Sequence, residues 1–511
     1  MRGALLAALC FCIVHTAHST DIFVPDDYAS IQVAIYYAQD GDRVIVRAGT
    51  YTETINFIGR KVTVKSEKGP VVTTIDAGGA GSVFKFVNNE GLDSVVDGFT
   101  LTGGSGTLDP LGLYSGGAIY CQSASPTISN NIISQNTATT GYGGAVYCMT
   151  NSTPTIIFNR ITENSSKKCG SGLYCRASSA VIYGNRITGN TTGGCGGGIA
   201  CSLGTEATIL DNFIAHNDAA DTGGGIACFR ANPDIANNII VYNRSNLGGG
   251  GIDCWRESSP TITHNTISEN FATYGGGGIS CHERCFPKVV NTILWNNAAA
   301  MGNEVWAGTA AEPSFLSISH SNISGGLAAA HFEMGSGFVI GQGIIDVDPL
   351  FVDVGADDFH LTIDSPCINA GGFGTGIELP ARDFEGDDRV VFGRADIGAD
   401  EAALHLYYRA QAVPGGEISV GCIGLPGMGV VLALGSGKKQ DPLKTQWGEF
   451  YLNGPYFYTL IGYIPANGAL VNTYTIPQNW IPGKKYPFQA LCGGLTWIDP
   501  LLTNLMMVVV E

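Results

Sequence analysis

Positive charge and long apolar runs are both scarce in this chain. Its 511 residues carry 27 Lys and Arg against 44 Asp and Glu, a net charge of −17. Because nucleic-acid binding needs a basic patch, this balance argues against nucleic acid as a partner. Beyond residue 19, no apolar run reaches the roughly 20 residues that a membrane-spanning helix needs. We therefore expect no membrane span in the body of the protein.

Charge of either sign is also sparse, whereas glycine is abundant. Only 14% of the residues are charged, and 71 are glycine. This composition is typical of a turn-rich β protein and disfavours a helical one. The length is sufficient for more than one domain.

The first 19 residues read as a secretory signal peptide. Arg2 gives a basic start, an apolar run follows from Ala4 to Val14, and Ala17-His18-Ser19 supplies small residues for cleavage. We expect cleavage after Ser19 and a mature protein that is secreted, periplasmic or on the cell surface.

A strand-like motif of glycines, an apolar residue and a cysteine recurs along the chain. It appears as GGAIYC, GGAVYC, GSGLYC, GGGIAC (twice), GGGIDC and GGGISC. Its cysteines are Cys121, Cys148, Cys175, Cys201, Cys228, Cys254 and Cys281, spaced by 26 or 27 residues. A fixed period of this length indicates a solenoid of stacked units.

Asparagine keeps the same period. Asn-x-Ile-x-x-Asn occurs at 131/136, 159/164, 185/190, 212/217, 238/243, 265/270 and 291/296. Stacked Asn side chains can hydrogen-bond from one unit to the next, and Asn tolerates the left-handed conformation of tight turns. We therefore expect two Asn columns at the bends of the coils.

These repeats predict an all-β parallel β-helix with coils of about 27 residues. Short β-branched runs such as Thr155–Ile157 and Thr261–Thr263 are its expected strands. Coils stacked about 4.8 Å apart bury the apolar face that a single coil cannot bury alone. Leucine-rich repeats would need a leucine ladder, and propeller blades would need four strands in some 40 residues.

A short helix is expected before the first coils. Ile31, Ala34, Ile35 and Ala38 share one helical face, and Ser30 is a candidate N-cap. Such a helix would cover the first open sheet edge, which otherwise invites aggregation.

Two segments carry a family resemblance. The opening reads IQVAIYYAQDGDRVIVRAGTYTETI and then VVDGFTLTGG, and it closely resembles secreted proteins of the pectate-lyase-like superfamily. The resemblance spans residues 21–340 and implies a right-handed parallel β-helix. The stretch DPLFVDVGADDFHLTIDSPCINAGG resembles the closing segment of exported bacterial β-helix proteins.

From about residue 402 the repeat stops, and short strands with Pro/Gly turns follow. This part resembles the small β-rich tail domain of exported proteins from planctomycete-like bacteria. The expected organisation is thus a signal peptide (1–19), a β-helix (20–345), its closing segment (346–401) and a β-sandwich-like tail domain (402–511).

Removing Cys10 and Cys12 with the signal leaves 13 of the 15 cysteines. In the repeated strand Ile252 and Cys254 share one face, which we take as the core, so the cysteine column should be buried free thiols. No His or carboxylate shares that face, which disfavours a soft-metal site. The better disulfide candidates are Cys169 with Cys195 and Cys422 with Cys492.

The positions on either side of each ladder cysteine should point outward. One column begins with Tyr120, Tyr147 and Tyr174 and ends with Asp253 and Ser280. We predict a ligand-binding patch near the last repeats, made of Phe229, Arg230, Asp253, Trp255, Arg256 and His282. Rings beside charged groups suit a polysaccharide or another cell-surface component, because rings cover apolar sugar faces while charged groups bond hydroxyls. Alternatively, these aromatics only stabilise neighbouring strands.

Catalytic constellations of the superfamily are mostly missing. Polygalacturonase-type enzymes carry Asn-Thr-Asp, His-Gly and Arg-x-Lys, none of which occurs here. A lyase would need carboxylates and a nearby base, for which the candidates are Asp253, Glu257, Glu283 and Arg284. The main hypothesis is a non-catalytic carbohydrate-binding protein. A polysaccharide lyase or glycoside hydrolase and a structural or adhesive stalk are the alternatives.

No cofactor is expected apart from structural calcium. Loop carboxylates cluster in the closing segment, and the candidate ligands are Asp346, Asp348, Asp383 and Asp387. None of them has an EF-hand spacing, and loop carboxylates are commonly just solvated.

Overall fold

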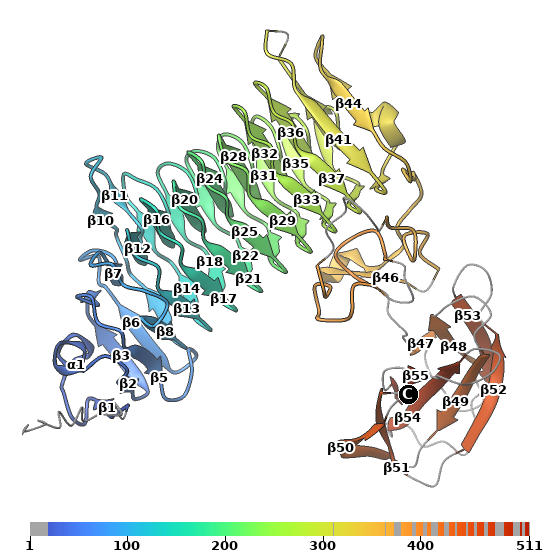
Figure 1. Cartoon of the computed structure of the whole chain (residues 1–511), viewed down its shortest axis with the longest axis horizontal. Helices are drawn as coiled ribbons and strands as arrows, with labels where there is room; N and C mark the ends of the chain where they lie inside the picture. The colour runs from blue at the N-terminus through green and yellow to red at the C-terminus, as the bar shows by residue number, and fades with distance from the viewer. Residues whose placement is uncertain are drawn as a thin grey trace, which may run out of the picture.

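The computed structural model describes residues 19–309, 311–362, 364–372, 380–390 and 395–401, and after 401 the strands between 406 and 509 without their side chains. Its main body is a solenoid of parallel strands stacked coil on coil (Figure 1). The chain is an all-β right-handed parallel β-helix, as the repeats and the resemblance predicted.

Each typical coil contributes one strand to each of four parallel sheets, numbered here in the order in which a coil visits them. Sheet 1 has 13 strands. They are β1 (Asp21–Val24), β2 (Arg43–Val46), β5 (Thr63–Ser66), β8 (Val95–Asp97), β13 (Thr127–Ser129), β17 (Thr155–Ile157), β21 (Val181–Tyr183), β25 (Thr208–Leu210), β29 (Asp234–Ala236), β33 (Thr261–Thr263), β37 (Lys288–Val290), β41 (Phe315–Ser319) and β44 (Gly337–Ile340).

Sheet 2 follows after a tight turn and has 11 strands. They are β3 (Gly49–Thr52), β6 (Thr73–Asp76), β9 (Thr100–Thr102), β14 (Ile132–Ser134), β18 (Arg160–Thr162), β22 (Arg186–Thr188), β26 (Phe213–Ala215), β30 (Ile239–Val241), β34 (Thr266–Ser268), β38 (Ile293–Trp295) and β42 (Asn322–Ile323).

Sheet 3 is shorter, with seven strands. They are β15 (Thr137–Ala138), β19 (Ser165–Ser166), β23 (Thr191–Thr192), β27 (Asp218–Ala219), β31 (Arg244–Ser245), β35 (Phe271–Gly275) and β39 (Ala298–Met301).

Sheet 4 contains the cysteine repeat in its 11 strands. They are β4 (Ile55–Asn56), β7 (Phe84–Phe86), β12 (Ile119–Gln122), β16 (Val146–Met149), β20 (Leu173–Arg176), β24 (Ile199–Ser202), β28 (Ile226–Phe229), β32 (Ile252–Trp255), β36 (Ile279–His282), β40 (Val305–Ala307) and β43 (His331–Phe332).

The predicted helix is present as α1 (Ile31–Tyr37) at the start of the solenoid (Figure 1). Ser30 caps it by accepting from the Val33 N–H, and Ile31, Ala34 and Ile35 are buried. The Gln32 side chain also exchanges two hydrogen bonds with the Asn56 backbone in β4, the first strand of sheet 4. The helix thereby satisfies backbone groups at an edge that would otherwise be open.

The core is a stack of identical rows. Cys121 pairs with Cys148, and the register continues cysteine on cysteine to Cys281, every member being buried. The first glycine of each motif allows the turn into the strand. Gly143 has φ 66°, and a Cβ there would lie 2.5 Å from the Val146 oxygen. A side chain at this position would therefore strain the coil.

The two Asn columns are buried ladders. In the second column Asn217 accepts from the Asn190 side chain at 3.0 Å and donates to Asn243 at 3.0 Å, and it also donates to the Ile187 carbonyl. The residue before each ladder Asn, not the Asn itself, adopts the left-handed conformation, and even Phe158 and Tyr242 do so. The ladder hydrogen bonds, rather than tolerance of positive φ, therefore explain why Asn recurs.

The last predicted Asn pair is wrong by one residue. Thr292 and Asn297 occupy the column positions in that coil, whereas Asn291 and Asn296 have positive φ. The second column ends on Glu304, whose carboxylate accepts from the Asn297 backbone and side chain. Burial raises the pKa of Glu304 to about 8. A carboxyl group therefore replaces the next Asn as acceptor.

The closing segment packs on the outer side of sheet 2. It contains β45 (Phe351–Asp353), the short helix η2 (Val354–Ala356) and β46 (Asp358–Leu361). Phe359 and Ala399 pack against Phe213, Ile239 and Val241. The Arg389 guanidinium, which is fully buried, donates to Asn237 at 2.8 Å. The segment thus covers an apolar patch that upstream coils, with Arg160 and Arg186 at the equivalent position, do not have.

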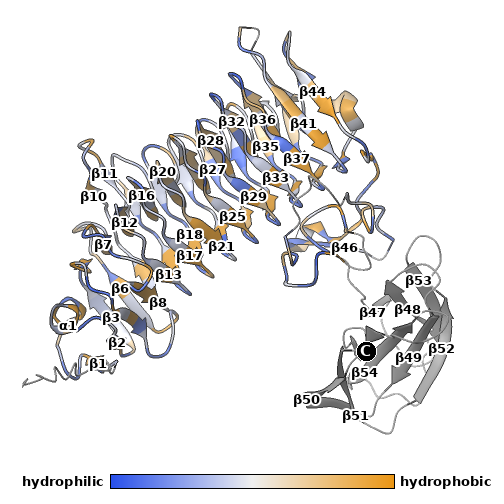
Figure 2. Ribbon diagram, in the orientation of Figure 1, coloured by the Kyte–Doolittle hydropathy of each residue, from blue (hydrophilic) through white to orange (hydrophobic). Residues whose placement is uncertain are grey.

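The end of the solenoid is apolar. The short helix η1 (Gly326–Ala329) lies between β42 and β43, and strands β41 and β44 are mostly apolar in Figure 2. A small hairpin, β10 (Thr107–Leu108) with β11 (Tyr114–Ser115), extends from one early coil.

After residue 401 the structure describes ten strands that pair antiparallel, so the tail is also β-rich. They are β47 (Leu406–Arg409), β48 (Glu417–Ile423), β49 (Gly429–Leu434), β50 (Gly437–Thr445), β51 (Gly448–Asn453), β52 (Phe457–Tyr463), β53 (Ala469–Thr475), β54 (Lys485–Gly493), β55 (Leu501–Leu502) and β56 (Met506–Val509).

Candidate functional site

Three of the predicted ligand-binding residues form a stacked row at the end of sheet 4. Phe229, Trp255 and His282 pair directly in the registers of β28, β32 and β36. The Phe229 and Trp255 ring centroids lie 4.9 Å apart, and the Trp255 and His282 rings stack at 5.7 Å. All three are half-buried. We call these three residues the aromatic strip.

Charged side chains line the turn that follows the strip. Arg230, Arg256 and Glu257 have positive φ values between 49° and 58°, and Glu283 and Arg284 have values of 60° and 61°. These charged residues therefore gather in the tight turn after the strand, as the sequence order predicted.

The charges in this turn are paired between coils. Arg256 contacts Glu283 at 2.8 Å, and Arg284 contacts Glu257 at 2.9 Å. The Arg256 guanidinium also lies 4.7 Å from the centroid of the Trp255 ring. Exposed pairs of this kind contribute little to stability. They do leave hydrogen-bonding groups beside the aromatic strip.

Asp253 differs from its predicted role as a surface ligand or catalytic acid. Its side chain is only 2% exposed, and it accepts from Ser280 and contacts His282 Nε2 at 3.0 Å. Burial lowers the pKa of His282, but the charge of Asp253, its hydrogen bond to the ring and the charge of Glu283 together outweigh this effect, so the pKa of His282 is raised. Asp253 therefore positions His282 and does not itself face solvent.

The tyrosine end of the outer column is also buried, contrary to the prediction. Tyr120, Tyr147 and Tyr174 are at most 7% exposed. Tyr142, from the glycine-rich turn before β16, stacks on Tyr174 at 4.6 Å. Cys169 and Cys195 pack in the same layer. The turn residues thus cover the outer face of sheet 4, and a sugar chain cannot lie on these rings.

Cys169 and Cys195 are neighbours on adjacent coils. The Cys195 N–H donates to the Cys169 sulfur at 3.3 Å, and both thiols are free. Their pairing stays a prediction. Cys422 and Cys492 lie in the tail, whose side chains are outside the described part of the chain.

The predicted calcium ligands serve mainly as turn acceptors. Asp346 accepts from the Gly325 N–H and Asp348 from the Leu350 N–H, both at 2.9 Å. Asp383 accepts three backbone N–H groups of its own turn, including that of Asp387. Within the described residues these four carboxylates form no common ligand group.

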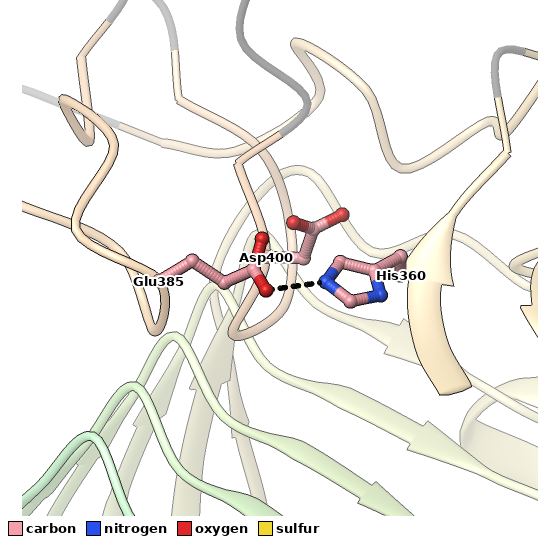
Figure 3. Close-up of side chains that lie close together, drawn as sticks. All are labelled: His360, Glu385 and Asp400. Atoms are coloured by element: carbon pink, nitrogen blue, oxygen red, sulfur yellow. Dashed lines mark ion pairs between the residues drawn. The ribbon is translucent and has the colours of Figure 1, made fainter. Parts of the chain in front are cut away.

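A different group of three meets in the closing segment, and the sequence reasoning missed it. His360, Glu385 and Asp400 place one ligand atom each within 4.8 Å of one another. Figure 3 shows Glu385 and His360 pointing toward each other, with Asp400 beside them. Nε2 of His360 lies 2.9 Å from Glu385, and Nδ1 contacts Asp358.

The carboxylates dominate the electrostatics of this group. The hydrogen bond to Glu385 raises the pKa of His360 to about 10, with further contributions from Asp400 and Asp358. Asp400 also accepts from the Leu361 N–H at 2.8 Å. No local spacing could have signalled the group, because 25 and 15 residues separate its members along the chain.

No helix in the described residues is long and apolar enough to cross a membrane. A family model described as right handed beta helix region matches residues 74–220 and 180–315. No curated protein matches the chain. The matched residues cover much of the stacked coils and leave out the closing segment and the tail. The chain is therefore similar to this family over its repeats, a likeness that extends to the fold and not to an activity.

Proposed function

We propose that this is an exported, non-catalytic protein that binds a carbohydrate chain at the aromatic strip. The observation that carries the proposal is the in-register row of Phe229, Trp255 and His282, half-buried and bordered by charged turn residues. Export rests on the signal-like residues 1–19. The site is on the outer face of the solenoid, where extended surfaces of repeat proteins bind long partners.

The chemistry of the strip matches a sugar chain better than an ion or an apolar ligand. Ring edges provide apolar contact, while guanidinium and carboxylate groups at the same edge can bond hydroxyls. Three arginines and two glutamates line the turn, so neither sign dominates. A neutral polysaccharide fits this balance without bound cations.

The same geometry disfavours catalysis. General acid–base chemistry needs a carboxyl group that reaches the substrate. Asp253 is buried, and the two glutamates of the turn, exposed Glu257 and half-buried Glu283, are each held by an arginine. The arrangement therefore supports binding over the lyase or hydrolase alternative.

The test is a glycan-array screen of the mature chain beginning at Thr20, with and without calcium, beside a Trp255→Ala variant. Phe158→Ala is the matched control, because Phe158 is also an exposed outer ring, 53% exposed, that packs on a neighbouring ring at 5.3 Å. We expect selective binding that Trp255→Ala loses and Phe158→Ala keeps.

Three results would contradict the proposal. If no glycan binds, or if both variants bind like the parent protein, the strip only stabilises neighbouring strands. If a bound polysaccharide is degraded and Glu283→Gln abolishes the degradation, the protein is an enzyme. Calcium-dependent binding that survives Trp255→Ala would move the site away from the strip.

A further inference from the structure

The closing segment brings together three side chains of kinds that bind metal ions. His360 comes from β46, Glu385 from the turn that Asp383 organises, and Asp400 from the end of the segment. Their positions are fixed by the fold, since Asp400 accepts from the Leu361 N–H and Asp358 contacts Nδ1 of His360. Nε2 thereby faces Glu385, and Asp400 lies beside the ring (Figure 3).

We propose that His360, Glu385 and Asp400 bind a divalent transition-metal ion of the zinc class, which holds the closing segment in the conformation that packs on the β-helix. One imidazole and two carboxylates are a suitable donor set for such an ion, with a further position for water. Two ligands of a tetrahedral site that are each about 2.1 Å from the ion lie about 3.4 Å apart. Nε2 of His360 and Oε1 of Glu385 lie 2.9 Å apart, so a small adjustment admits the ion.

The surroundings resemble an outer shell of a metal site. The Asp358 carboxylate on Nδ1 orients the ring and increases its basicity, as carboxylates commonly do behind metal-bound histidines. Three carboxylates around one imidazole also give the group a net negative charge. A divalent cation would offset this charge.

The position gives the ion a structural role. Phe359 and Ala399 are the residues that pack against the apolar patch of sheet 2, and the ligands His360 and Asp400 follow them directly in the chain. An ion that joins these two ligands to Glu385 would hold both packing points together. Metal binding would then stabilise the docked segment, because an ion that binds only the folded state shifts the folding equilibrium.

The experiment uses the full mature chain after chelator treatment. Zn²⁺ is titrated by calorimetry, and bound metal is counted by elemental analysis for the parent protein, His360→Gln, Glu385→Gln and His216→Gln. His216 is the matched control, because it is exposed and faces a single carboxylate, Asp357, at 3.6 Å. Glu385 is 49% exposed, so its variant keeps the fold.

We expect one Zn²⁺ per chain for the parent protein and for His216→Gln, and at least tenfold weaker binding for the other two variants. Asp358→Asn should weaken binding by about 10- to 100-fold, as loss of an outer-shell partner does. Zn²⁺ should also slow proteolysis of the closing segment in the parent protein and not in Glu385→Gln. Equal zinc binding by all variants, no binding at all, or selective binding of Ca²⁺ in its place would overturn the proposal.

Discussion

The two ends of the outer row of sheet 4 occupy equivalent strand positions and yet have different surroundings. At the first end Tyr120, Tyr147 and Tyr174 are covered by turn residues and form a second apolar layer. At the other end Ser280 donates to Asp253, and the neighbouring aromatic strip is half-buried. Both ends of this row are buried, and what differs is the chemistry, with packed rings at one end and hydrogen-bonding groups at the other.

The largest loss of stability should come from a substitution in the buried tyrosine layer. Tyr147 is fully buried and contacts three other tyrosine rings, so Tyr147→Ala should reduce the free energy of unfolding by about 3–5 kcal/mol. Urea denaturation measures this change. Tyr147→Phe is the control, since among the described residues its hydroxyl has no hydrogen-bond partner, and it should cost less than about 1 kcal/mol. A large loss in the control would mean that the hydroxyl matters.

A smaller effect is expected at the open end. Trp255 is only half-buried, so Trp255→Ala should cost about 2 kcal/mol, less than the tyrosine variant. Thermal unfolding followed by circular dichroism compares the two variants directly. Equal losses would show that the strip is as much a part of the core as the tyrosines, and would weaken the case for a ligand site.

The pair formed by Asp253 and His282 should make stability depend on pH. Because the pKa of His282 is raised in the folded protein, its contribution is complete below the ordinary histidine value of about 6.5 and is lost as pH rises through the raised value. Asp253→Asn should cost about 1–2 kcal/mol at acidic pH and little at alkaline pH. Unfolding midpoints measured from acidic to alkaline pH give the pH dependence of stability. If Asp253→Asn shows the same pH dependence as the parent protein, other groups cause it.

The smallest effect should follow from the surface charges. Arg256 is 44% exposed and its pair with Glu283 is screened by solvent, so Arg256→Gln should change stability by less than about 1 kcal/mol. The same variant should still reduce glycan affinity if the proposed site is correct. Thermal unfolding measures the contribution of Arg256 to stability, and array binding measures its contribution to glycan affinity. A variant that loses stability but keeps affinity would show that Arg256 is structural and not part of the binding site.

The period of the sequence was sufficient to predict the coils, the cysteine core and most of both Asn ladders. In a parallel solenoid each residue contacts the equivalent residue one coil away. A spacing of 26 or 27 residues therefore predicts these contacts directly. The prediction failed at the last Asn pair, where the coil keeps its 27-residue spacing and Thr292 takes the place of an Asn, while Asn291 and Asn296 lie one residue earlier. The order of Phe229, Trp255 and His282 was likewise readable, because these residues are one coil apart.

Only the tertiary structure decided what covers the coils. Tyr142 packs over its neighbours, Asp253 contacts His282 on the next coil, and the closing segment brings Arg389 to Asn237, 152 residues away in the sequence. None of these contacts recurs from coil to coil, so no sequence spacing predicts them. The same holds for His360, Glu385 and Asp400, whose meeting depends on where an irregular segment packs. The sequence by itself determined the stacking, since stacking is periodic, whereas the packing of single side chains over the stack determined which positions are free to bind.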